Sequence, residues 1–134
     1  MDLFDRFAGN DSWHTRRLLE YAGTLTEEQL DRPLPTVAEL LPWRESNKTL
    51  RQLLENIVFT KEVWTAALSG ADMDMNGPPK SQRSPQALLH RLEKTDAELH
   101  RILGDIRNRS GWDDTFVDAL CEPAETFTYG GVFA

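Results

Sequence analysis

The sequence predicts an all-α protein, and three features carry that prediction. Three long segments repeat apolar residues at the 3.6-residue spacing of a helix that buries one face. Two Thr-x-x-Gln capping boxes and one Ser-Pro pair mark helix starts. The 134 residues, 40% of them apolar and 28% charged, suit a single domain over residues 1–134 with one core.

The first long helix is predicted over Leu3–Ala22. Residues 9–12 (GNDS) favour turns and N-caps, so both a kink there and a start at Ser12 stay open. The capping box Thr26–Gln29 then predicts a short helical turn. The apolar face expected of the first helix and its end consists of Phe4, Phe7, Leu18, Ala22 and Leu25.

The second and third long helices are predicted over Leu50–Ser69 and Pro85–Arg107. The second follows the box Thr49–Gln52 and ends before Gly70, which suits a left-handed C-terminal residue. Its apolar stripe comprises Leu50, Leu53, Leu54, Ile57, Val58, Trp64 and Leu68. The stripe of the third helix comprises Leu88, Leu92, Leu99, Ile102 and Ile106.

The remaining segments connect or follow these helices. A proline-containing connector separates the first two, with Trp43 expected to fold onto the helices. Turn residues prevail between Gly111 and Phe127, with a short extended piece at residues 115–117. The apolar ending after Thr128 predicts a fourth helix that begins there and that the sequence cuts off at Ala134.

Several passages resemble the DinB-like family of four-helix-bundle metalloproteins. They are residues 13–20 (WHTRRLLE), 25–31 (LTEEQLD), 49–58 (TLRQLLENIV), 62–64 (EVW) and 127–134 (FTYGGVFA). The resemblance implies a four-helix bundle that holds a divalent metal, zinc or nickel, through three histidines. It also implies relatives such as the mycothiol-dependent maleylpyruvate isomerase and the bacillithiol transferases, which use a low-molecular-weight thiol.

The family pattern places its first metal ligand in the middle of the second helix, where this sequence has Asn56. The other two histidines, on the last helix, would lie after Ala134. An asparagine amide oxygen is a weak ligand for zinc or nickel, whereas a neutral imidazole is a good one. The resemblance therefore implies an altered metal site, and a buried amide satisfied by a neighbour is the plainer interpretation of Asn56.

His14 is a second candidate ligand, and Asp11 is its partner. On a continuous helix His14 shares the face of Phe7 and Leu18, and Asp11 lies one turn earlier. A carboxylate can hold the second nitrogen of a metal-binding imidazole in this way. A polar cluster, or an N-cap aspartate beside a kink, is the plainer interpretation of the pair, because one histidine–carboxylate pair is a weak signal. Asn56, His14 and Asp11 are the predicted metal-site residues.

Composition excludes several classes of function. The formal net charge of -7 disfavours nucleic-acid binding, because an acidic chain repels phosphate backbones. Neither a secretion signal nor a membrane-spanning run is present, and the lone Cys121 suits the cytoplasm. Cys121 has no evident activating base, and His90 and His100 point apart on one helix, so we expect the histidines to be solvated.

Two functions remain, and whether the protein is an enzyme stays open. The first is a metal-dependent enzyme that acts on a small molecule, as a thiol-dependent transferase or isomerase, with an altered metal site. The alternative is a non-catalytic binding or interaction protein on the same bundle. The resemblance further implies a homodimer formed through helix faces, with Trp43 and Trp112 near the contact.

Overall fold

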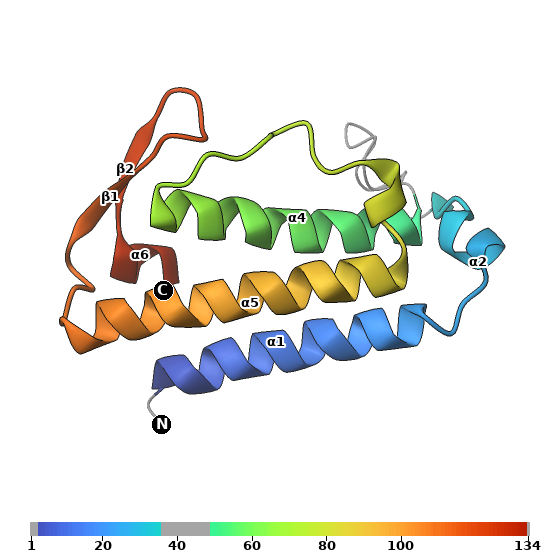
Figure 1. The fold of residues 1–134 in the computed structure, drawn as a ribbon, viewed down its shortest axis with the longest axis horizontal. Helices are drawn as coiled ribbons and strands as arrows, with labels where there is room; N and C mark the ends of the chain where they lie inside the picture. Colours follow the sequence, from blue (N-terminus) through green and yellow to red (C-terminus); the bar gives the residue numbers. More distant parts are fainter. Residues whose placement is uncertain (1–2, 36–48, 134) are drawn as a thin grey trace. The chain divides into compact units, whose positions relative to one another are not determined.

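A computed structural model describes residues 3–35 and 49–133 of the chain. It confirms the all-α class, since helices dominate and the described strands form one two-stranded sheet (Figure 1). No described helix has the length and apolarity that crossing a bilayer requires. The elements are α1 (Leu3–Ala22), α2 (Glu27–Asp31), α4 (Leu50–Ser69), η2 (Lys80–Gln82), α5 (Pro85–Asn108), β1 (Thr115–Asp118), β2 (Glu125–Thr128) and α6 (Tyr129–Phe133).

The helix ends confirm the predictions made from capping residues. Thr26 and Gln29 form a reciprocal capping box at α2, and Thr49 and Gln52 form the same pair of bonds at α4. Ser84 Oγ accepts a hydrogen bond from the Ala87 amide at the start of α5. Gly70, with φ +71, follows α4 in the left-handed conformation. These ends depend on a few adjacent residues, which is why local sequence predicts them well.

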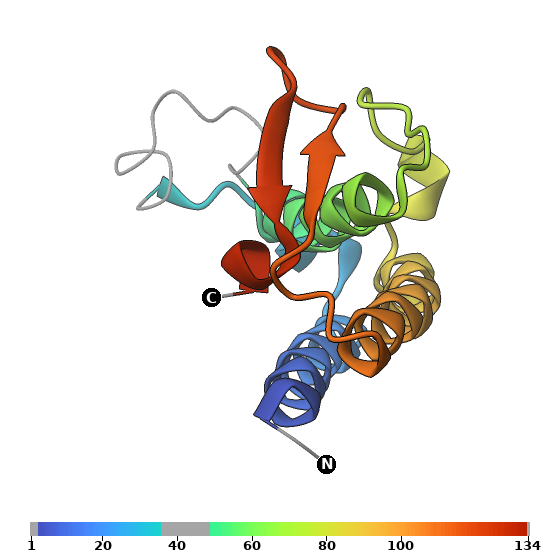
Figure 2. The same cartoon turned by 90° about the vertical axis from the view of Figure 1, so that its left-hand side faces the viewer.

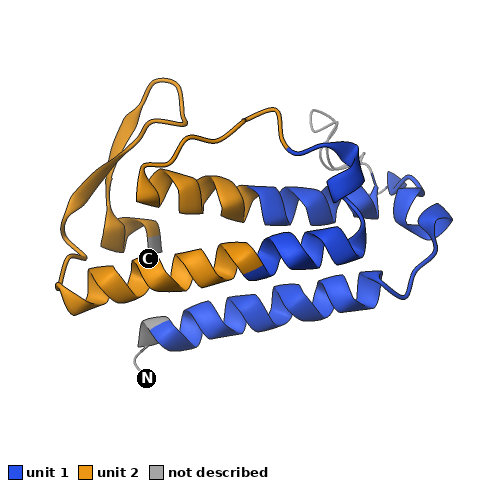
Figure 3. Cartoon of the chain, in the orientation of Figure 1, with its two compact units in different colours: residues 1–59, 78–93 blue, residues 60–77, 94–134 orange. Residues whose placement is uncertain are grey.

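The chain divides into two compact units, and the division falls within α4 and within α5 (Figure 3). Unit 1 comprises residues 1–59 and 78–93, and unit 2 comprises residues 60–77 and 94–134. Each unit has its own hydrophobic core. The prediction of one domain over residues 1–134 stays a prediction.

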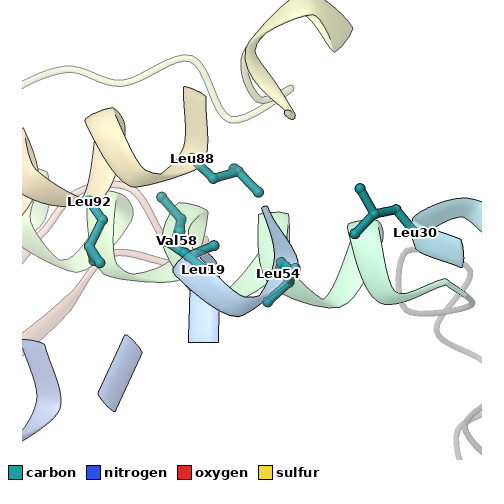
Figure 4. Close-up of a cluster of buried hydrophobic side chains, with 7 residues drawn as sticks. Leu19, Leu30, Leu54, Val58, Leu88 and Leu92 are labelled. Carbon is teal, nitrogen blue, oxygen red and sulfur yellow. The ribbon is translucent and has the colours of Figure 1, made fainter. Parts of the chain in front are cut away.

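The core of unit 1 is aliphatic and draws on four helices (Figure 4). Its buried members are Leu19, Ala22, Leu30, Leu54, Val58, Leu88 and Leu92. Burying one leucine side chain stabilises the fold by about 1.5–3 kcal/mol. Leu30 brings the short helix α2 into this core, so the start of α4 and the start of α5 share one buried centre with α2.

The core of unit 2 is built partly from aromatic rings. β1 and β2 form an antiparallel hairpin (Figure 2). In its register Phe116 lies opposite Phe127. Phe116 stacks on Tyr129 with ring centroids 5.0 Å apart, and Trp64 meets Phe127 edge to face at 5.9 Å. β1 confirms the extended piece predicted at residues 115–117. The second strand, β2, was not predicted, because turns were expected as far as Phe127. The helix predicted to begin after Thr128 is present as α6.

The predicted face of α1 is partly wrong. Phe7 and Leu18 are 62% and 42% exposed, while Leu19 and Ala22 are buried. A stripe of less exposed positions steps by four and three residues through Ala8, Ser12, Thr15, Leu19 and Ala22, and all of these except Leu19 have small side chains. The prediction placed the largest apolar residues on the buried face, whereas the buried face of α1 is the neighbouring one, which carries Leu19 and Ala22.

Other predicted positions had mixed outcomes. The stripe of α5 is buried or half-buried throughout, but Ile57 and Trp64 on α4 are exposed. Helix α1 is continuous through Gly9, so the alternative start at Ser12 is wrong. Trp43 lies outside the described residues.

Candidate functional site

Asn56, the predicted metal-ligand position, lies near the middle of α4 in unit 1 and is half-buried. Its place on the helix is one turn after Gln52 and one turn before Thr60, so these three share a face. An amide at this position offers one acceptor oxygen and two N–H donors. It suits hydrogen bonding to a polar group better than it suits holding zinc or nickel.

His14 and Asp11 lie on α1 with exposed side chains. The expectation that His14 lies at the centre of a buried apolar face is therefore wrong. The face of α1 that carries Phe7, His14 and Leu18 is exposed. The His14 ring packs edge to face against Trp13, with centroids 4.8 Å apart. Trp13 is itself 57% exposed.

A cavity of about 540 Å³ lies within unit 1. Its walls come from α2, the start of α4, η2 and the residues that lead into α5. Cavities of this volume are typical of small-molecule sites. The charged residues of the lining are Glu27, Asp31, Arg51, Lys80 and Arg83.

Arg51 joins three segments at the edge of this cavity. Its Nε donates to Asp31 Oδ1 at 2.6 Å, its Nη2 contacts Glu27, and its Nη1 donates to the carbonyl oxygen of Arg83 at 3.1 Å. The hydrogen bond to Asp31 raises the pKa of Arg51 above its ordinary value, and the charges of Asp31 and Glu27 add to this. Arg51 therefore stays charged and ties α2 and the segment before α5 to α4.

A second charged group lies deeper in unit 1. Arg91 on α5 donates to Glu55 Oε2 on α4 at 2.5 Å and to the carbonyl oxygen of Gln82 at 3.1 Å. Arg83 Nε lies 3.9 Å from the other oxygen of Glu55. Two guanidinium groups thus share one mostly buried carboxylate.

Comparison with known proteins is consistent with the helical architecture. Residues 11–134 match the family described as the DinB superfamily. The chain belongs to the DinB superfamily. No curated protein matches the chain, and no solved structure matches it.

The described residues do not fit the three-histidine metal centre that the superfamily resemblance implies. Asn56 on α4 lies where the resemblance implies an imidazole, and an amide oxygen is a weak ligand for zinc or nickel. Within residues 3–35 and 49–133, no group of three or more His, Cys, Asp and Glu side chains is placed to hold a metal ion. Asp11, His14 and Asn56 therefore remain a predicted set of ligands, and we derive no reaction step through a metal.

The remaining predicted residues have structural explanations in this member of the superfamily. His90 and His100 are exposed, as expected. Burial raises the pKa of the Cys121 thiol, which lies 3.2 Å from the carbonyl oxygen of Asp118, so the thiol is poorly activated as a nucleophile. Gly130 packs closely against Trp112, where an added Cβ would lie 3.1 Å from the Trp112 carbonyl oxygen.

Sequence analysis missed the cavity altogether. Its charged residues come from three separated stretches of the chain. Taken alone, each stretch predicts only a solvated helix end or a loop. The signal that existed was the pair of capping boxes, at residues 26–29 and 49–52, because they fix the helix starts that line the cavity.

Proposed function

We propose that this protein is a small-molecule-binding member of the DinB superfamily that functions without the three-histidine metal centre. The observation that carries the proposal is Asn56, a half-buried amide in the middle of α4, at the position where the superfamily resemblance implies a first histidine. Two histidine ligands leave zinc or nickel open to water and exchange, so the ion would be held weakly. The polar cavity of unit 1 supports a binding role, because its volume suits a small molecule.

The test is the metal content of the protein, purified without a histidine tag. We expect much less than one zinc or nickel ion per chain in the wild-type protein. The variant Asn56→His restores the imidazole of the pattern, and we expect it to bind either metal at least about tenfold more tightly than wild type. Asn56→Gln, which keeps an amide, is the matched control and should not gain affinity. Stoichiometric zinc or nickel in the wild-type protein would overturn the proposal.

A metal-dependent enzyme with a rebuilt centre is the second candidate. It is favoured by the position of His14, which is exposed and has Asp11 one turn earlier on α1. Such an enzyme would use Asn56, His14 and Asp11 around a divalent ion, with a low-molecular-weight thiol as co-substrate. Stoichiometric metal that disappears in His14→Ala would support this candidate. Metal that survives the substitution would place the ligands elsewhere.

Location and assembly belong to the same proposal. A cytoplasmic location is supported by the lone Cys121, which needs no oxidising compartment. A homodimer is expected from the superfamily resemblance, although Trp112 packs against the core of unit 2. Light scattering at micromolar concentration measures the assembly, and a monomer mass would contradict the dimer.

A further inference from the structure

The charges that line the unit 1 cavity are not all neutralised by one another. Glu27 and Asp31, the two acidic groups of the lining, both bind Arg51. Arg51 also donates a hydrogen bond to the carbonyl oxygen of Arg83. Arg51 therefore balances one of these two acidic charges, and the five charged residues of the lining, three basic and two acidic, give it a formal charge of +1.

The basic side of the cavity is different. Lys80 is exposed, and the described part of the chain gives it no ion-pair partner. Arg83 Nε is buried without a hydrogen-bond partner among the described residues, and its distance of 3.9 Å from Glu55 is beyond hydrogen-bond reach. Glu55 is in turn neutralised by Arg91 at 2.5 Å. Lys80 and Arg83 thus leave positive charge at the cavity wall, although the chain as a whole is acidic.

We infer that the unit 1 cavity binds a small organic anion, whose carboxylate or phosphate group lies against Lys80 and Arg83. This inference rests on the proposed small-molecule-binding function and names the ligand class. A guanidinium can hold two oxygens of such a group, and an ammonium adds a mobile point charge. The cavity, at about 540 Å³, has room for more than the anionic group, so the group belongs to a larger molecule.

A cationic ligand does not fit this arrangement. It would have to displace Arg51 from Asp31 and Glu27, and Asp31 keeps the pKa of Arg51 above its ordinary value. Arg51 also holds the Arg83 carbonyl oxygen, so its displacement would loosen the wall of the cavity.

The test titrates the full chain with inorganic phosphate and, in a separate arm, with malonate, at constant ionic strength set with chloride. Backbone amide NMR shifts of residues 80–84 report binding at the cavity. The variant Lys80→Gln removes one exposed positive charge, and Lys94→Gln is its matched control, because Lys94 is exposed and does not line the cavity. A second variant, Arg83→Gln, removes the other cation while the backbone carbonyl bound by Arg51 remains.

We expect the amide shifts to saturate as anion is added to the wild-type protein. The affinity obtained from them should fall roughly two- to fivefold in Lys80→Gln, the range of an exposed charge contact. Lys94→Gln should bind as wild type does, and Arg83→Gln should bind more weakly than wild type. Saturation by phosphate alone assigns a phosphate group to the ligand, and saturation by malonate alone assigns a carboxylate.

Two results would overturn the inference. One is the absence of saturation by either anion, and the other is an equal loss of affinity in Lys80→Gln and Lys94→Gln. Metal content, measured on the same preparation, separates this failure from failure of the proposed function. Low metal content without anion binding rejects only the ligand class, whereas stoichiometric metal rejects the proposed function whatever the anions do.

Discussion

In each unit a mostly buried ion pair joins α4 to α5, and the two pairs differ in what surrounds them. In unit 1 the acid, Glu55, is on α4 and the base, Arg91, is on α5. In unit 2 the base, Lys61, is on α4 and the acid, Asp96, is on α5. Both pairs have a nitrogen–oxygen distance of 2.5 Å, and all four side chains are 9–15% exposed.

The surroundings decide how much each carboxylate depends on its partner. Glu55 has a second cation nearby, because Arg83 Nε lies 3.9 Å from it. In the part of the chain that the structure describes, Lys61 is the cation that lies against Asp96. A buried charge that loses its partner costs far more than the pair contributes when intact. The pair in unit 2 should therefore be the more sensitive to loss of its base.

The largest expected effect is that of Lys61→Met. This change leaves Asp96 buried without its cation, and we expect the free energy of unfolding to fall by about 3–5 kcal/mol. Urea unfolding followed by circular dichroism measures it. Lys94→Met, at an exposed lysine of α5, is the control and should change stability little. A loss in Lys61→Met no larger than that of the control would contradict the dependence of Asp96 on Lys61.

Arg91→Met should have a smaller effect. Glu55 keeps Arg83 close by, so we expect a loss of about 2–3 kcal/mol, below the usual range for breaking a buried pair. The double variant Arg83→Gln/Arg91→Met removes both cations. Its loss should exceed the sum of the two single losses, because each arginine compensates for the other. Additive losses would show that Arg83 does not compensate for the loss of Arg91.

These pairs also show what the sequence could and could not predict. The starts of α4 and α5 were predicted to the residue, because the caps Thr49 and Ser84 accept hydrogen bonds from nearby amides. By contrast, Arg51 and Asp31 at the cavity lie 20 positions apart in the sequence, and Arg91 and Glu55 lie 36 apart. A pattern within one segment of the sequence does not predict such tertiary contacts.

Prediction of the buried faces depended on residue size. On α5 the large aliphatic residues are also the least exposed, so its stripe was predicted well. On α1 small residues occupy the inward positions, and ranking by size selected Phe7 and Leu18 instead. The same error placed His14 inside. Asn56 was identified only through resemblance, because one asparagine in a helix has no periodic signal.

A third prediction replaces the whole pair of unit 2. The double variant Lys61→Met/Asp96→Leu removes both buried charges and fills the space with apolar atoms. We expect stability within about 1 kcal/mol of wild type, because an apolar pair avoids the cost of desolvating two ions. Thermal unfolding of the double variant beside Lys61→Met tests this. A double variant as unstable as Lys61→Met would mean that Asp96 is not the source of the penalty.

The smallest expected change in stability comes from breaking an exposed ion pair on α5, between Arg101 and Glu98. This pair is the solvent-exposed counterpart of the two buried pairs. Arg101 donates to Glu98 at 2.7 Å, and this hydrogen bond lowers the pKa of the Glu98 carboxyl below its ordinary value. A carboxyl whose pKa is lowered by folding adds stability above its unfolded pKa. That stability is lost as the pH falls through the folded pKa. Arg101→Gln should therefore raise the pKa of Glu98 towards its ordinary value, and it should lower stability slightly at neutral pH. Below the folded pKa of Glu98 the two proteins should be equally stable.

The Glu98 side-chain carboxyl signal, followed by NMR against pH, measures this shift in both proteins. Arg6→Gln is the matched control, because Arg6 is exposed on α1 and is not among the residues that contact Glu98. Added salt should reduce the difference between wild type and Arg101→Gln, since solvent-exposed charges are readily screened. The buried pair of unit 2 should respond much less to salt, because both its side chains are largely out of water. Equal salt sensitivity of the two pairs would remove the distinction between them, since burial is what makes Lys61 indispensable to Asp96 and leaves Arg101 dispensable to Glu98.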